Sequence, residues 1–123
     1  MKVSLDTNVW IFGIVGADKF CERILLNLEK FMVVVPDQIR EELERNLSDY
    51  DMKQFDQFVL RFGVTVDFEA VPANYITVFE RKALKKGDAE IGAYCEWRHI
   101  DVIVSDNRDF LRGLSPGLVT LLR

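Results

Sequence analysis

The sequence has little of what several common kinds of functional site require. Its 123 residues include only two cysteines, Cys21 and Cys95, and a single histidine, His99. Two cysteines are too few for a disulfide scaffold, and both fall in helix-like apolar patterns that predict small core residues in a reducing compartment. A single histidine excludes His-rich zinc sites, and any Ser-His or Cys-His catalysis would have to use His99, which follows Arg98 in a predicted surface turn.

Long hydrophobic runs and an excess of positive charge are absent too. The longest unbroken apolar run, residues 31–35, is far too short to cross a bilayer, and the N-terminus enters a predicted strand without a cleavable leader pattern. Sixteen basic and 20 acidic residues give a net charge of -4, so nucleic-acid binding would have to be local or metal-assisted. We therefore expect a cytoplasmic protein that does not bind a membrane.

The remaining composition is that of one globular domain. With 49% apolar and 29% charged residues, a chain of this length can bury a core, which predicts a single domain over residues 1–123. Short apolar strands alternate with amphipathic helices, which predicts an α/β fold, a three-layer α/β/α sandwich with a mainly parallel central sheet and right-handed crossovers. The predicted strands are 2–5, 31–35, 64–66, 102–105 and 119–122; the predicted helices are 18–30, 37–47, 51–62, 73–86, 88–98 and 107–111.

Acidic residues recur where predicted strands end or helices begin. Asp6 directly follows the first strand, and Asp88 begins a helix after Gly87. Helical spacing at about 100° per residue places Glu42 beside the apolar stripe of its helix, whereas Glu41 points almost directly away. A simpler interpretation of Asp88 is that it only caps its helix, since Asp is favoured there.

A third cluster of polar residues follows the strand of residues 102–105. It contains Asp106, Asn107 and Asp109, and its position mirrors that of Asp6 on another strand end. A helix cap and a surface charge would explain these residues equally well. Convergence on one sheet edge favours a cation, because two carboxylates about 5 Å apart repel by roughly 3 kcal/mol at an effective dielectric near 20. Oxygen ligands without His or Cys suit Mg²⁺ or Mn²⁺.

Four motifs together resemble the PIN domain family. They are Asp6-Thr7-Asn8-Val9, the segment from Pro36 that ends in Glu42-Leu43, the segment 87–93 that begins Gly87-Asp88, and the segment 104–110. The resemblance covers nearly the whole chain, and it implies a metal-dependent endoribonuclease that hydrolyses phosphodiester bonds and leaves a 5′-phosphate and a 3′-hydroxyl. PIN domains of this length often resemble VapC-type toxins, which implies an antitoxin protein partner and a homodimer.

The family motifs transfer to this chain residue by residue. Asn107 stands where many members have an aspartate, so Asp106 or Asp109 would supply the fourth charge, and Asp109 is favoured. In this hypothesis Asp6 and Asp88 hold the metal, while Glu42 and Asp109 orient its waters or a second ion. The residues implied are catalytic Asp6, Glu42, Asp88 and Asp109; metal-binding Asp6, Asp88, Asp106 and Asp109; and supporting polar Asn8, Ser105 and Asn107.

One dense basic patch precedes Asp88, and two rival functions stay open. The patch, Arg81, Lys82, Lys85 and Lys86, is predicted to guide single-stranded or structured RNA, although an ordinary solvated helix face explains it as well. One rival is a catalytically silent PIN scaffold that binds RNA or protein. The other is a phosphohydrolase like the haloacid dehalogenases, against which Asn8 argues, because that chemistry needs a second Asp two residues after the first.

Overall fold

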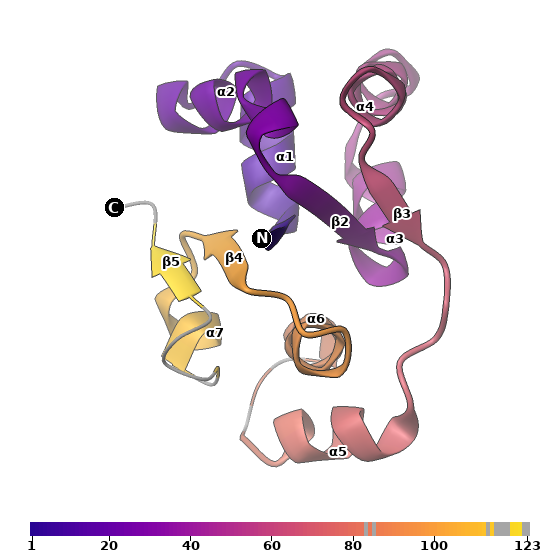
Figure 1. Cartoon of the computed structure of the whole chain (residues 1–123), viewed down its shortest axis with the longest axis vertical. Coiled ribbons are helices and arrows are strands. Elements are labelled where there is room, and N and C mark those ends of the chain that lie inside the picture. Colours follow the sequence, from indigo (N-terminus) through magenta and orange to yellow (C-terminus); the bar gives the residue numbers. More distant parts are fainter. Residues whose placement is uncertain (83, 85, 113, 115–118, 122–123) are drawn as a thin grey trace.

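The strands form one parallel sheet in the order β3-β2-β1-β4-β5 (Figure 1). The computed structural model describes residues 1–82, 84, 86–112, 114 and 119–121. The strands are β1 (Lys2–Leu5), β2 (Met32–Pro36), β3 (Thr65–Asp67), β4 (Val102–Ser105) and β5 (Val119–Leu121). The helices are α1 (Thr7–Ile14), α2 (Lys19–Leu26), the 3-10 turn η1 (Leu28–Lys30), α3 (Asp37–Asn46), α4 (Asp49–Phe62), α5 (Ala73–Glu80), α6 (Lys86–Trp97) and α7 (Arg108–Arg112).

Helices cover the sheet in two layers, which confirms the predicted α/β/α architecture. Figure 1 shows α1, α2 and α4 along one side of the row of strands and α5 to α7 along the other. This separation follows from the strand order, because right-handed crossovers toward β3 and toward β5 must lie on opposite faces of a parallel sheet. Among the described residues, no helix combines the length and the apolar character needed to span a membrane.

The central strand β1 delivers Asp6 to the carboxyl edge of the sheet. It pairs with β2 on one side and β4 on the other, with Leu5 opposite Val104. The pairing continues one residue further, since the Asp6 N–H donates to the Val104 carbonyl at 2.9 Å. Asp6 and Ser105 therefore stand on adjacent strand ends, where open parallel sheets bind ligands.

The first helix was not predicted from the sequence. Residues 7–14 form α1, although this segment was not among the predicted helices. Its residues are apolar on more than one side of the helix, and Val9 and Trp10 are both buried. Gly13 lies against α2, and a Cβ there would be 2.5 Å from Leu25 Cδ1. The glycine thus permits close helix packing. The predicted helix 18–30 is also split, because α2 ends at Leu26 and η1 follows.

The predicted helix 73–86 was wrong at its end. The helix α5 stops at Glu80, and α6 begins at Lys86, so that Gly87 lies in the first turn of α6 instead of terminating a helix. A Cβ on Gly87 would lie 3.1 Å from Glu42 Oε1. The residue therefore allows α6 of one layer to approach α3 of the other, just past the edge of the sheet.

The two cysteines belong to the core, as predicted. Both are free and buried, and burial raises the pKa of Cys95 to about 12, so that its thiol stays neutral. Trp10 and Phe55 are also buried and pack edge to face with ring centroids 5.0 Å apart. This aromatic contact joins α1 to α4.

Candidate functional site

Asp6 is a buried carboxylate, only 8% exposed. Its Oδ1 accepts a hydrogen bond from the Thr7 N–H at 2.8 Å, and its Oδ2 accepts one from the Ser105 hydroxyl at 2.7 Å. Burial raises the pKa of Asp6, the bonds from Ser105 and Thr7 lower it, and the charges of Asp88 and Glu42 raise it again, with a net shift upward. Burial first, and the two neighbouring charges after it, therefore disfavour the ionised form of Asp6 more than its two hydrogen bonds favour it.

Glu42 reaches this site from α3. Its Oε2 accepts a hydrogen bond from the Thr7 hydroxyl, and its Oε1 accepts one from Gln38 Nε2 at 3.3 Å. The contact between Thr7 and Glu42 joins residues 35 positions apart. Thr7 stands in the first motif but was given no role there, and Gln38 was not a predicted site residue, because nothing in the local pattern indicates a contact across that separation.

Asp88 comes from the opposite helix layer. It lies half-buried in the first turn of α6, directly after Gly87, where an added Cβ would crowd Glu42. Its charge raises the pKa of Asp6, so the two carboxylates share one electrostatic environment. The sequence contained a signal for this approach in the Gly87-Asp88 pair, since glycine permits a close helix contact.

The fourth motif contributes Ser105 to the site. Ser105 is fully buried, and besides bonding Asp6 its hydroxyl accepts the Asn107 N–H at 3.1 Å. Asn107 Oδ1 accepts the Phe110 N–H at 3.2 Å, which is the helix-capping arrangement considered from the sequence. Asp106 is exposed. The side chain of Asp109 lies outside the described part of the chain.

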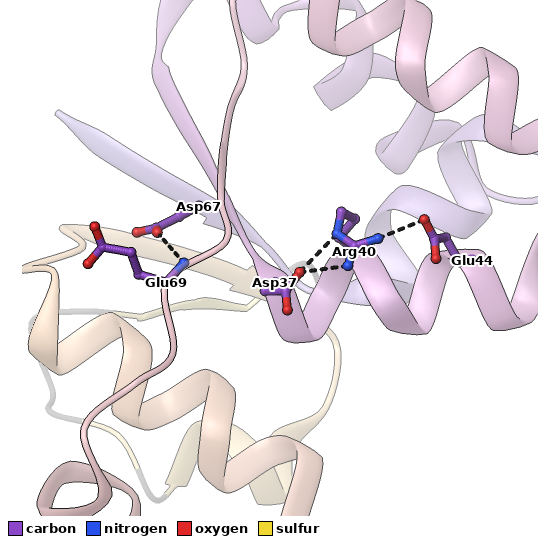
Figure 2. A network of polar contacts seen from close by, with 5 residues as sticks. All are labelled: Asp37, Arg40, Glu44, Asp67 and Glu69. Carbon is purple, nitrogen blue, oxygen red and sulfur yellow. Dashed lines mark hydrogen bonds and ion pairs between the residues drawn. The ribbon is translucent and has the colours of Figure 1, made fainter.

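The other acidic residues of α3 are engaged elsewhere. Figure 2 shows Arg40 between Asp37 and Glu44, and the ion-pair distance is 2.7 Å to each. Glu41 is exposed and lines a hollow of about 280 Å³ outside the site, together with Glu90 of α6. Among these residues of α3, Glu42 is thus the carboxylate that faces Asp6.

A second polar network links α6 to the end of β3. Tyr94 donates to Asp67 Oδ2 at 2.8 Å, and Arg98 Nε donates to the same oxygen at 3.0 Å. Asp67 Oδ1 accepts the Glu69 N–H at 3.0 Å, which Figure 2 shows. Burial pushes the pKa of Asp67 upward, but these hydrogen bonds outweigh it and the pKa is lowered. Because Asp67 pairs with Pro36, the network fixes α6 relative to the start of α3.

The remaining predicted residues are less closely connected to the carboxylates. Asn8 is exposed, and no hydrogen bond among the described residues joins it to Asp6 or Glu42. Arg81 and Lys82 are exposed after the end of α5. Lys85 and the side chain of Lys86 lie outside the described residues.

The donor set fits a hard cation in charge and in ligand type. Within the described part of the chain, no three His, Cys, Asp or Glu side chains are close enough together to hold a metal ion in this conformation. The charges of Asp88 and Glu42 nevertheless both raise the pKa of Asp6. Among the described residues, each oxygen of Asp6 accepts one hydrogen bond, and a carboxylate oxygen has a second lone pair for a metal.

A model of the PIN domain family matches residues 3–113. The chain belongs to the PIN domain family. This confirms the resemblance drawn from the four motifs, and the match spans Asp6, Glu42, Asp88 and Ser105. Among curated protein sequences, none matches this PIN domain significantly.

Solved structures show the same fold. VapBC2 from Rickettsia felis, bound to a DNA fragment from its promoter, superposes with a TM-score of 0.75 at 19% identity over 100% of both chains. A toxin-antitoxin complex from Klebsiella pneumoniae has a TM-score of 0.69 at 19% identity over 96% of each chain. PAE2754 from Pyrobaculum aerophilum has a TM-score of 0.58 at 15% identity over 97% of this chain and 89% of its own.

Proposed function

We propose that this PIN domain is an endoribonuclease that hydrolyses phosphodiester bonds of RNA with Mg²⁺ or Mn²⁺. The observation that carries the proposal is the burial of Asp6 beside two further carboxylates that raise its pKa. Such an arrangement destabilises the ionised, metal-free site. A divalent cation would remove that penalty, and all-oxygen ligands select a hard ion.

The side chains divide the work by position. Asp6 and Asp88 would hold the ion, because they stand on a strand end and a helix start that meet at one edge. When bound, the ion would lower the pKa of a water and neutralise charge on the phosphate. Glu42 would orient the attacking water. Asp109 or Asp106 would provide the fourth carboxylate, with Asn8, Ser105 and Asn107 in supporting roles.

Substrate approach would use the basic segment before α6. Arg81 and Lys82 are exposed, and the chain runs from them directly into the turn that carries Asp88. Local positive charge of this kind attracts phosphate backbones despite a net charge of -4. Lys85 and Lys86 belong to the same proposed patch.

An RNA cleavage assay with matched carboxylate variants tests the proposal. End-labelled single-stranded RNA is incubated with the purified protein and Mn²⁺, beside Asp6→Asn, Asp88→Asn and the exposed control Glu41→Gln. We expect the wild type and the control to cut, and the two aspartate variants to lose at least about 100-fold in rate. Cleavage that persists in both aspartate variants would exclude this site.

The same assay separates the rival functions. RNA binding without cleavage by the wild type would indicate a silent scaffold. Release of phosphate from small esters, without RNA cleavage, would indicate a phosphohydrolase. Products with a 5′-phosphate and a 3′-hydroxyl are expected for the nuclease.

The proposed partners are an antitoxin and a second copy of the chain. One solved structure with this fold is a toxin-antitoxin complex, and another is VapBC2 bound to promoter DNA. In this chain, α2 and α4 present exposed apolar side chains such as Phe20, Leu26 and Leu60. Expression of the wild type in bacteria should arrest growth, expression of Asp6→Asn should not, and a co-expressed antitoxin should restore growth. Sedimentation analysis of the purified chain should give twice the monomer mass; a monomer at all concentrations would contradict the dimer.

A further inference from the structure

We propose that Thr7 is a positioning residue that sets the Glu42 carboxylate relative to Asp6. The inference rests on the proposed nuclease function and adds a residue to it. Thr7 would not touch the reacting phosphate or the metal. It would act through Glu42, by fixing where that carboxylate points.

Thr7 donates hydrogen bonds to two carboxylates at once. Its N–H bonds Asp6 Oδ1 at 2.8 Å, and its hydroxyl bonds Glu42 Oε2. Thr7 is only 8% exposed, and a threonine side chain in a helix has few rotamers open to it. One residue at the start of α1 therefore defines the separation between a strand-end carboxylate and a carboxylate of α3.

The other oxygen of Glu42 is held less firmly. Gln38 Nε2 donates to Oε1 at 3.3 Å, which is long for such a bond. Gly87 leaves this oxygen room, since a Cβ there would lie 3.1 Å from Oε1. Among the described residues, removal of the Thr7 hydroxyl would leave the Glu42 carboxylate with the long bond from Gln38 alone.

Electrostatic repulsion makes the hydroxyl necessary. Glu42 is half-buried, so its flexible side chain can rotate toward solvent. Like charges repel, so the neighbouring carboxylates of Asp6 and Asp88 favour that rotation. The Thr7 hydroxyl, a neutral donor next to Asp6, opposes this rotation of Glu42. It adds no positive charge that would compete with a cation for the site.

Two substitutions at Thr7 separate the hydroxyl from the shape of the side chain. Thr7→Val has nearly the same shape and no donor, whereas Thr7→Ser keeps the hydroxyl. Thr77→Val is the matched control, because the exposed Thr77 hydroxyl donates to the Ala73 carbonyl of its own helix and, among the described residues, to no carboxylate. We measure kcat and KM for single-stranded RNA with Mn²⁺, the Kd for Mn²⁺ alone by calorimetry, and the melting temperature.

We expect Thr7→Val to lower kcat about 10- to 100-fold with KM nearly unchanged, as for loss of a positioned catalytic group. Its Kd for Mn²⁺ should rise about three- to tenfold, while Thr7→Ser and Thr77→Val stay within about twofold of the wild type. The double variant Thr7→Val/Glu42→Gln should be no slower than Glu42→Gln alone, because Thr7 acts through Glu42.

Three results would overturn the proposal: a wild-type kcat in Thr7→Val, an equal loss in Thr7→Ser, or a Thr7→Val effect that multiplies fully with that of Glu42→Gln. A wild type that binds Mn²⁺ but leaves RNA intact would instead refute the proposed function. In that case the Mn²⁺ affinities of Thr7→Val and Thr7→Ser would still decide the role of Thr7.

Discussion

Replacement of Asp6 by asparagine should stabilise the metal-free protein at neutral pH. The folded protein raises the pKa of Asp6, with burial as the largest cause, above the model value of 3.8. The native state therefore binds this proton more tightly than the unfolded state, and stability falls as pH rises through the interval between the two pKa values. Asp6→Asn removes that loss, so its advantage over the wild type should vanish below pH 3.8.

The same substitution should abolish the response to Mn²⁺. At 100 times its Kd, a ligand that binds only the native state stabilises it by about 2.7 kcal/mol. An unfolding entropy of about 2.1 cal/mol/K per residue gives roughly 0.26 kcal/mol/K for 123 residues. The melting temperature of the wild type should thus rise by about 10 °C with Mn²⁺, whereas that of Asp6→Asn should not change.

Thermal unfolding followed by circular dichroism checks both parts. Scans are run between pH 3 and pH 8, in EDTA and in saturating Mn²⁺, with Asp56→Asn as the control because Asp56 is an exposed carboxylate of α4. The control should behave as the wild type. If Asp6→Asn melts below the wild type in EDTA at pH 7, or gains as much from Mn²⁺, the electrostatic reasoning about Asp6 is wrong.

Four further substitutions test the packing around the site by chemical denaturation. Ser4 and Ser105 are both fully buried, but the Ser4 hydroxyl has no hydrogen-bond partner among the described residues. Ser4→Ala should therefore leave the free energy of unfolding unchanged or raise it, whereas Ser105→Ala should lower it by about 1 to 3 kcal/mol. Equal losses in the two variants would contradict this reasoning. Tyr94→Phe should cost about 1 to 2 kcal/mol at neutral pH. That cost should shrink below pH 3.8, because the pKa of Asp67 is lowered in the folded protein. The ionised carboxylate therefore stabilises the fold above this pH, and the stabilisation is lost as Asp67 is protonated. A cost that does not depend on pH would count against the network. Gly92→Ala should lower the free energy of unfolding by about 1 to 3 kcal/mol, since its Cβ would lie 2.9 Å from the ring of the buried Phe79 in α5. An unchanged denaturation midpoint would show that α5 can move away.

The sheet was predictable from the sequence where strands are buried on both faces. The runs near residues 31–35 and 102–105 consist of apolar, largely β-branched residues, and they form β2 and β4 within one residue of the predicted bounds. The helix α1 was not predictable from hydrophobic periodicity, because its sequence is apolar on most sides and is hardly amphipathic. The break before α6 was missed because Gly87 was interpreted as a helix end, while its role is close approach to α3.

The site was predictable in part. A position after an apolar strand or at a helix start indicated Asp6 and Asp88, and helical spacing separated the half-buried Glu42 from the exposed Glu41. Thr7 belongs to the first motif, but its role could not be predicted, because it depends on a tertiary contact with Glu42. Local patterns identify which side chains reach an edge of the sheet. They do not identify which neighbours hold those side chains in place.

The most direct test of the central claim is the anomalous scattering of Mn²⁺ in crystals of the protein grown or soaked with that ion. We predict an anomalous peak for Mn²⁺ about 2.1 Å from carboxylate oxygens of both Asp6 and Asp88. The Glu42 carboxylate should still accept its hydrogen bond from the Thr7 hydroxyl. A peak at which neither aspartate is a ligand would contradict the assignment of this edge of the sheet as the metal site. So would the absence of a peak between Asp6 and Asp88 at a Mn²⁺ concentration that supports RNA cleavage.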